Sequence, residues 1–215
     1  MPICKKNKII FVHIPRTGGT SLLKFLNIER KKDNLYGGYC HYSLMLKQHY
    51  PLYKIKNYLN LTLDNLNHID NYFKFSIVRN PYSRFISIYN FMRELNTNKG
   101  RTFNSFLDLV EQIYKTNNFS EHIYYQSLRN QWEFLIEKSD EKIDLDALFK
   151  FEKIKSSELF LQLKFNKENP LLHFNHIENS INLTKYQKYR IYKLYKKDFE
   201  LFNYSPELDE VLELI

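Results

Sequence analysis

Arginine, threonine, serine and glycine residues gather at one point near the start of the chain, directly after an apolar segment. Residues 9–14 are apolar without alternation, except for His13, and predict a strand buried on both faces. Two glycines then permit a tight turn, and Thr20 and Ser21 are expected to cap a helix over residues 22–26. Backbone N–H groups and the helix dipole would meet there, which predicts a phosphate site. The side chains expected to add donors are Arg16, Thr17, Thr20 and Ser21.

A second strand and a second helix N-terminus follow at residues 73–93. Residues 73–78 predict a strand, Asn80 suits a helix N-cap, and Pro81 suits the first helical position. Apolar residues at helical spacing then predict a helix to about Arg93. Arg79 therefore ends a strand, where ligands collect in open α/β sheets.

The segment P-R-T-G-G-T-S at residues 15–21 lacks the G-x-x-x-x-G-K-[ST] pattern of nucleoside triphosphate loops. It resembles instead the 5′-phosphosulfate loop of sulfotransferases, which bind 3′-phosphoadenosine-5′-phosphosulfate (PAPS). Many members carry Lys where this chain has Arg16. An ordinary glycine turn between a strand and a helix is the alternative interpretation. The resemblance implies that PAPS is bound by Arg16, Thr17, Gly18, Gly19, Thr20 and Ser21.

Three further segments resemble the same family. Arg79 and Ser87 match its 3′-phosphate motif, in which an Arg ends a strand and a Ser follows eight residues later. The guanidinium offers a planar fork of donors to phosphate oxygens, and the Ser lies about two helical turns along. The F-E-x-L/I segment of the family is similar to Phe151-Glu152-Lys153-Ile154. Its closing helix is similar to residues 192–204. The alternative is a surface Arg and a Ser on a helix face.

The resemblance covers nearly the whole chain and is closest to carbohydrate sulfotransferases of the uronosyl 2-O and glucosaminyl 6-O types, with their soluble microbial or viral relatives. It implies a PAPS-dependent sulfotransferase whose single domain spans residues 1–215. Adenosine 3′,5′-bisphosphate is the expected product, and the expected acceptor is a hydroxyl of an oligo- or polysaccharide. Residues 175–180 are a candidate loop to close over the nucleotide.

The resemblance also implies a general base. Family members carry a histidine before a short helix. The matching segment here is Gly38-Tyr39-Cys40-His41-Tyr42-Ser43, which makes His41 the candidate base. A neutral imidazole can take the proton of an attacking hydroxyl, while Arg16 stabilises charge on the leaving phosphate oxygen. A loop histidine without a catalytic role is the alternative, and His13 is expected to be a core histidine. No metal is expected, because fixed cations and helix termini supply the charge.

The composition fits a globular protein with anionic partners. The chain has 215 residues, 43% of them hydrophobic, and a formal net charge of +8. Cys4 and Cys40 make no disulfide framework, which favours a reducing compartment. No apolar run of about 18 residues occurs, so we expect a cytoplasmic protein without a membrane span. The rival functions are a kinase-like, nucleotide-dependent phosphotransferase and a non-catalytic polyanion- or nucleic-acid-binding protein; nucleic acid is not an expected partner.

These elements predict an α/β protein, with a P-loop-like three-layer fold and a central, mainly parallel sheet flanked by helices. Outside the two phosphate segments, the patterns predict a short helix from Ser43 to Lys47 and a helix over residues 103–114. Residues 132–136 and 143–151 are predicted strands, and residues 153–165 a helix. Thr184 is expected to open a long amphipathic helix.

Overall fold

The computed structural model of the protein describes residues 3–4, 7–26, 39–40, 43–46, 49–56, 71–97, 100–136, 142–168, 170 and 181–208. The chain forms two compact units. Unit 1 comprises Met1–Val78 and Gln131–Asn175, and unit 2 comprises Arg79–Asn130 and His176–Ile215. This division does not test the prediction of a single sulfotransferase domain over residues 1–215, which stays a prediction.

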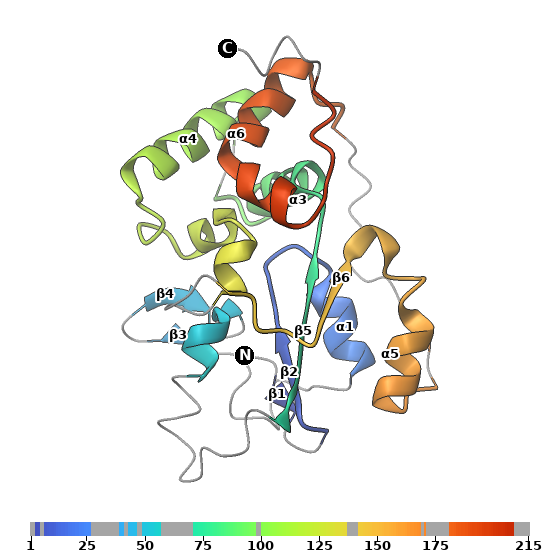
Figure 1. Ribbon diagram of the computed structural model, residues 1–215. Helices are drawn as coiled ribbons and strands as arrows, with labels where there is room; N and C mark the ends of the chain where they lie inside the picture. The colour runs from blue at the N-terminus through green and yellow to red at the C-terminus, as the bar shows by residue number, and fades with distance from the viewer. Residues whose placement is uncertain are drawn as a thin grey trace. The chain divides into compact units, whose positions relative to one another are not determined.

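Unit 1 is built on a sheet of the order β1-β2-β5-β6 (Figure 1). Its strands are β1 (Ile3–Cys4), β2 (Ile9–Val12), β5 (Phe73–Val78) and β6 (Ala147–Lys150). β1 runs antiparallel to β2, whereas β2, β5 and β6 are parallel, with Ile9 opposite Phe73 and Phe75 opposite Ala147. Every residue of β2 is buried, which explains why its sequence does not alternate. The two strands predicted to precede the phosphate segments are therefore parallel neighbours.

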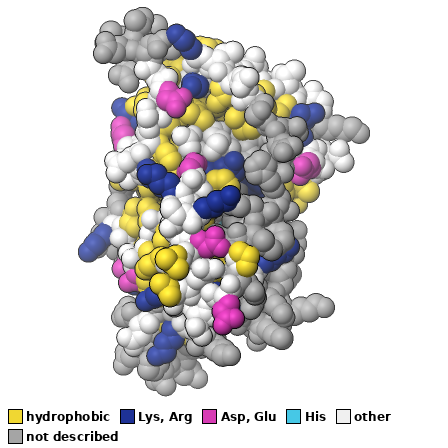
Figure 2. Space-filling view, turned by 90° about the vertical axis from the view of Figure 1, so that its right-hand side faces the viewer, with side chains coloured by type: hydrophobic (Ala, Val, Ile, Leu, Met, Phe, Trp, Pro, Cys, Tyr) yellow, Lys and Arg dark blue, Asp and Glu magenta, His cyan; other side chains and the backbone are white. Residues whose placement is uncertain are grey.

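Helices flank this sheet. α1 (Gly19–Phe25) and α5 (Glu158–Phe165) pack Leu22 and Phe165 against Phe11 and Phe75, whose rings are 5.2 Å apart. On the outer side of α5, Leu159, Phe160 and Leu163 are exposed, and Figure 2 shows hydrophobic side chains at the surface on this side of the molecule. The predicted α/β class, with a parallel sheet flanked by helices, is confirmed.

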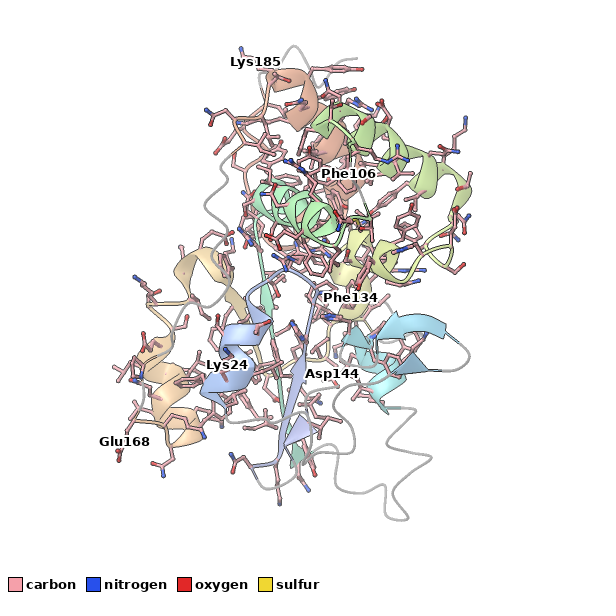
Figure 3. The ribbon with its side chains drawn as sticks, turned by 180° about the vertical axis from the view of Figure 1, so that it is seen from behind. Lys24, Phe106, Phe134, Asp144, Glu168 and Lys185 are labelled. Atoms are coloured by element: carbon pink, nitrogen blue, oxygen red, sulfur yellow. The ribbon has the colours of Figure 1, made fainter. Side chains whose placement is uncertain are left out.

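The opposite face of β5 carries an ion-pair cluster. Lys74 of β5 and Lys56 of the helical residues 52–56 both donate from Nζ to Oδ2 of Asp144, each over 2.8 Å. These two hydrogen bonds lower the pKa of Asp144, which is labelled in Figure 3, to about 2. Asp146 accepts the backbone N–H of Lys74 over 2.6 Å. The cluster ties residues 52–56 and the approach to β6 to the same strand.

Unit 2 is helical. It contains α3 (Pro81–Glu94), α4 (Phe103–Thr116), the 3₁₀ helix η3 (Ile123–Leu128) and α6 (Lys185–Leu201). Phe85, Phe106 and Tyr195 form its centre, and Phe106 is labelled in Figure 3. Tyr195 interrupts α6 with φ −117°, and its hydroxyl donates to the Leu128 carbonyl oxygen over 2.7 Å. The three helices predicted here are confirmed, including the N-cap at Thr184, whose side chain forms a capping box with Gln187.

Several predicted elements are wrong. The short helix predicted from Ser43 is not observed over residues 43–46, because β4 (Ser43–Leu46) pairs antiparallel with β3 (Tyr39–Cys40). So short a helix has little stability of its own. In place of a strand over residues 132–136 there is the 3₁₀ helix η4 (Trp132–Phe134), since a short apolar run has no decisive periodicity. The strand at 143–151 is reduced to β6, and the helix at 153–165 begins at Glu158 after the 3₁₀ helix η5 (Phe151–Lys153).

Candidate active site

The first phosphate segment forms a tight turn between β2 and α1. Arg16 has φ 66°, a left-handed conformation that is uncommon for a bulky side chain and is often found at functional sites. Gly18, with φ 87° and ψ 10°, is the N-cap of α1 and makes no side-chain cap. The predicted cap role of Thr20 and Ser21 is wrong, because both residues already lie within α1. The Ser21 N–H donates to the Gly18 carbonyl oxygen over 3.1 Å. The N–H groups of Gly19 and Thr20, which precede it in the first turn, are in principle available to an anion.

Three consecutive carbonyl groups at the exit of β2 each accept a hydrogen bond from a side chain. Ser76 Oγ donates to the Val12 oxygen over 2.7 Å, and Thr17 Oγ1 donates to the Ile14 oxygen over 2.9 Å. Between them, His49 Nδ1 lies 2.8 Å from the His13 oxygen. We call Ser76, His49 and Thr17 the strand-exit clamp. It fixes the backbone from which the turn begins.

Both glycines of the turn are needed for space, and Gly18 is also needed for its positive φ. A Cβ atom at Gly18 would lie 2.7 Å from the ring of Phe151, and one at Gly19 would lie 2.0 Å from Nε2 of His13. The F-E-x-L/I segment, predicted from resemblance, therefore places its Phe against the turn. His13 is 6% exposed and lies between the rings of Phe11 and His49, at centroid distances of 5.4 and 4.4 Å. This burial confirms that His13 is a core histidine.

The six loop residues predicted to bind PAPS lie together in unit 1, but their side chains differ in exposure. Thr20 is exposed, Arg16 is partly buried, and Ser21 is buried. Thr17 is fully buried, and its hydroxyl hydrogen is used on the Ile14 oxygen. Since a hydroxyl has one hydrogen to donate, only the backbone N–H of Thr17 is left as a donor to a ligand.

The second phosphate segment begins unit 2. Asn80 caps α3, because its Oδ1 accepts the N–H groups of Tyr82 and Ser83. Arg79 Nε donates to Ser83 Oγ over 3.0 Å, and Ser83 Oγ in turn donates to the Asn80 carbonyl oxygen over 3.1 Å. One turn further along, Ser87 is 9% exposed. Arg79 is thus oriented by the first turn of the helix that carries Ser87.

Two predicted features fall outside the part of the chain that the structure describes. They are His41, the nominated base, and the loop of residues 175–180. Their predictions are unchanged.

The model of the sulfotransferase family matches residues 1–205 of the chain. The chain belongs to the sulfotransferase family. No curated protein and no solved structure matches it. Sulfotransferases move a sulfonyl group from a donor to an acceptor, so the chain is a transferase. Among the described helices, none is both long and apolar enough to cross a bilayer.

Three residues that hold the two predicted phosphate segments were not predicted from the sequence. Ser76 gave a usable signal, since a polar residue within a strand buried on both faces needs a hydrogen-bond partner. Ser83 lies one helical turn after Arg79, a spacing at which side chains meet. His49 gave no local signal, because its partner His13 is 36 residues away in the sequence.

Proposed function

We propose that this sulfotransferase moves the sulfonyl group of PAPS to a hydroxyl group of a carbohydrate. The observation that carries the proposal is the turn after β2, where Arg16 is held at positive φ within the segment that resembles the phosphosulfate loop of the family. A kinase-like reaction is disfavoured because the turn has no Gly-Lys-Ser/Thr sequence. Family membership disfavours a purely polyanion-binding role.

In this proposal the turn binds the 5′-phosphosulfate. The backbone N–H groups of residues 17–20 and the hydroxyls of Thr20 and Ser21 are the donors. Gly18 and Gly19 allow the turn to pack against the rings of Phe151 and His13. Arg16 supplies the positive charge. That charge counts most as the S–O bond to the phosphate breaks, because the leaving oxygen then becomes more negative.

Arg79 and Ser87 bind the 3′-phosphate in this proposal. The support is the motif spacing together with the position of Arg79, which is bonded to Val78, the last residue of β5. Ser83 holds Nε of Arg79, which restricts the orientation of the guanidinium.

The chemical step is a displacement at sulfur. The acceptor oxygen forms a bond to sulfur, the bond from sulfur to the 5′-phosphate oxygen breaks, and adenosine 3′,5′-bisphosphate leaves with the electron pair. A histidine takes the acceptor's proton, and the motif nominates His41. The formal charge of +8 favours an acidic oligo- or polysaccharide as acceptor, in keeping with the carbohydrate sulfotransferases that the motifs resemble.

The nucleotide specificity is tested by thermal unfolding with added ligands. Adenosine 3′,5′-bisphosphate should raise the melting temperature, and ATP at the same concentration should not, because only a ligand that binds the folded state stabilises it. A larger shift with ATP would refute the proposal. Transfer of labelled sulfonate from PAPS across a panel of acidic and neutral glycans then tests the acceptor class, and modification of none of them would refute that part.

The role of Arg16 is tested by two substitutions. Arg16→Ala should lower the rate of transfer more than it lowers PAPS affinity, since the charge acts mainly in the transition state. Arg16→Lys should retain much of the activity, because Lys keeps the charge. A Lys variant that binds PAPS normally but transfers no sulfonate would show that the planar guanidinium itself is required.

A further inference from the structure

The imidazole of His49 connects a distant part of the chain to the turn that follows β2. His49 begins the segment of residues 49–56, and its Nδ1 lies 2.8 Å from the His13 carbonyl oxygen. The two imidazole rings are 4.4 Å apart between centroids. Because a carbonyl oxygen can only accept, Nδ1 of His49 carries the hydrogen. The contact is therefore a donated hydrogen bond to the backbone of the strand exit.

This carbonyl group lies at the point where the strand becomes the turn. The carbonyls before and after it, those of Val12 and Ile14, are held by Ser76 and Thr17. His49 thus holds the middle one of three successive peptide groups. Loss of its donor would leave a partly buried carbonyl without that bond, which favours rotation of the peptide group to find another donor. Such a rotation would displace the residues of the turn.

We propose that His49 is a positioning residue for sulfonyl transfer, which holds the turn of residues 15–18 in its ligand-binding conformation through the His13 carbonyl. The part that concerns the nucleotide depends on the proposed function, because it assumes that the turn binds the phosphosulfate. The part that concerns the conformation of the turn is independent of it. His49 acts through the backbone and needs no contact with the reacting atoms.

The hydrogen bond from Nδ1 of His49 distinguishes a positioning role from the role of a general base. The hydrogen on Nδ1 is present in the neutral ring of this tautomer and in the imidazolium ion, so the turn stays held at either charge. A general base would use the lone pair on Nε2 instead. An asparagine side chain places an N–H group near the position of Nδ1, whereas glutamine reaches toward the position of Nε2. Asn should therefore replace His49 as a positioning residue, and Gln should not.

The experiment compares His49→Asn, His49→Gln and His49→Ala by two measurements. Hydrogen exchange of the backbone amides of residues 16–20 reports the conformation of the turn, and titration with adenosine 3′,5′-bisphosphate reports nucleotide affinity. In the Ala and Gln variants we expect about three- to tenfold faster exchange and weaker binding, the size of one hydrogen bond. In the Asn variant both quantities should stay within about twofold of wild type.

Lys56→Ala is the matched control. It disturbs the same segment by removing an ion pair to Asp144, but it leaves the His13 carbonyl bond in place. It should change neither measurement by more than about twofold. Equal losses in the Lys56 and His49 variants would overturn the proposal, because displacement of the segment would then be the cause.

Two other results would also overturn it. One is an Asn variant as impaired as the Gln variant, and this comparison decides the question even if the Ala variant does not fold. The other is an Ala variant with unchanged exchange and unchanged nucleotide affinity, which would show that the bond of His49 to the His13 carbonyl does not hold the turn. If the wild type does not bind adenosine 3′,5′-bisphosphate, the proposed function fails, and the exchange measurement still decides the role of His49.

Discussion

Substitution of Gly19 by alanine tests whether the turn and the core histidine beneath it are packed as tightly as the structure indicates. The added methyl group would lie 2.0 Å from Nε2 and 2.1 Å from Cδ2 of His13. Non-bonded carbon atoms pack at about 3.5–4.0 Å, so the ring or the start of α1 must move by roughly 1.5 Å. The ring has little room, because it is 6% exposed and is flanked by Phe11 and His49.

Overpacking of this kind costs about 1–3 kcal/mol of unfolding free energy. Because Gly19 is the first residue of α1, the clash would also displace the start of the helix. We therefore expect affinity for adenosine 3′,5′-bisphosphate to fall by about tenfold or more, which corresponds to about 1.4 kcal/mol. Urea denaturation measures the first quantity, and calorimetric titration of the nucleotide measures the second.

Gly100→Ala is the control for the Gly19 variant. Gly100 also has a positive φ, of 79°, but a Cβ atom there would meet nothing within 4 Å. The control should lose roughly 1–2 kcal/mol of stability through backbone strain alone and keep its nucleotide affinity. The two variants would then be similar in stability and different in binding.

Removal of the His13 ring supplies the decisive comparison. In the double variant His13→Ala with Gly19→Ala, the methyl group fills part of the space that the ring leaves. The double variant should therefore be more stable than the sum of the single effects, by a coupling energy of about 0.5–3 kcal/mol. Strict additivity, or a Gly19→Ala variant with wild-type nucleotide affinity, would refute the packing argument.

Three further predictions follow from the same structure and motifs. Arg79→Ala should weaken adenosine 3′,5′-bisphosphate by about 1.5–3 kcal/mol and 5′-AMP far less in calorimetric titrations; equal losses would remove the 3′-phosphate assignment. His41→Ala should lower turnover by about 10²–10⁴-fold with little change in PAPS affinity, and a rate within about threefold of wild type would exclude it as the base. Lys56 and Lys74 lower the pKa of Asp144 to about 2. The ionised carboxylate therefore stabilises the fold at pH values above its ordinary pKa, and this stabilisation is lost as the pH falls from about 4 to about 2. In the Asp144→Asn variant, the unfolding free energy should decrease less between about pH 4 and about pH 2 than in the wild type. The difference should be no more than about 1 kcal/mol, since the carboxylate is 41% exposed. The same decrease in both proteins, measured by urea titration, would contradict this.

Elements with local signals could be predicted from the amino-acid sequence. An unbroken apolar run fixes β2 as a doubly buried strand, and Asn80 followed by Pro81 fixes the start of α3 through cap geometry. The Thr184 capping box does the same for α6. The turn between β2 and α1 could also be predicted, because glycine residues adopt backbone angles that other residues avoid.

Features that depend on partners far away in the sequence could not be predicted and became visible in the folded protein. Residues 43–46 form a strand because β3 pairs with them, although their own pattern is ambiguous. The Thr17 hydroxyl is used within the turn, and Gly19 is required by a ring rather than by its backbone angle. His49 holds the strand exit across 36 residues. Contacts of this kind arise from packing, and packing joins side chains by their distance in space, which local sequence patterns do not encode.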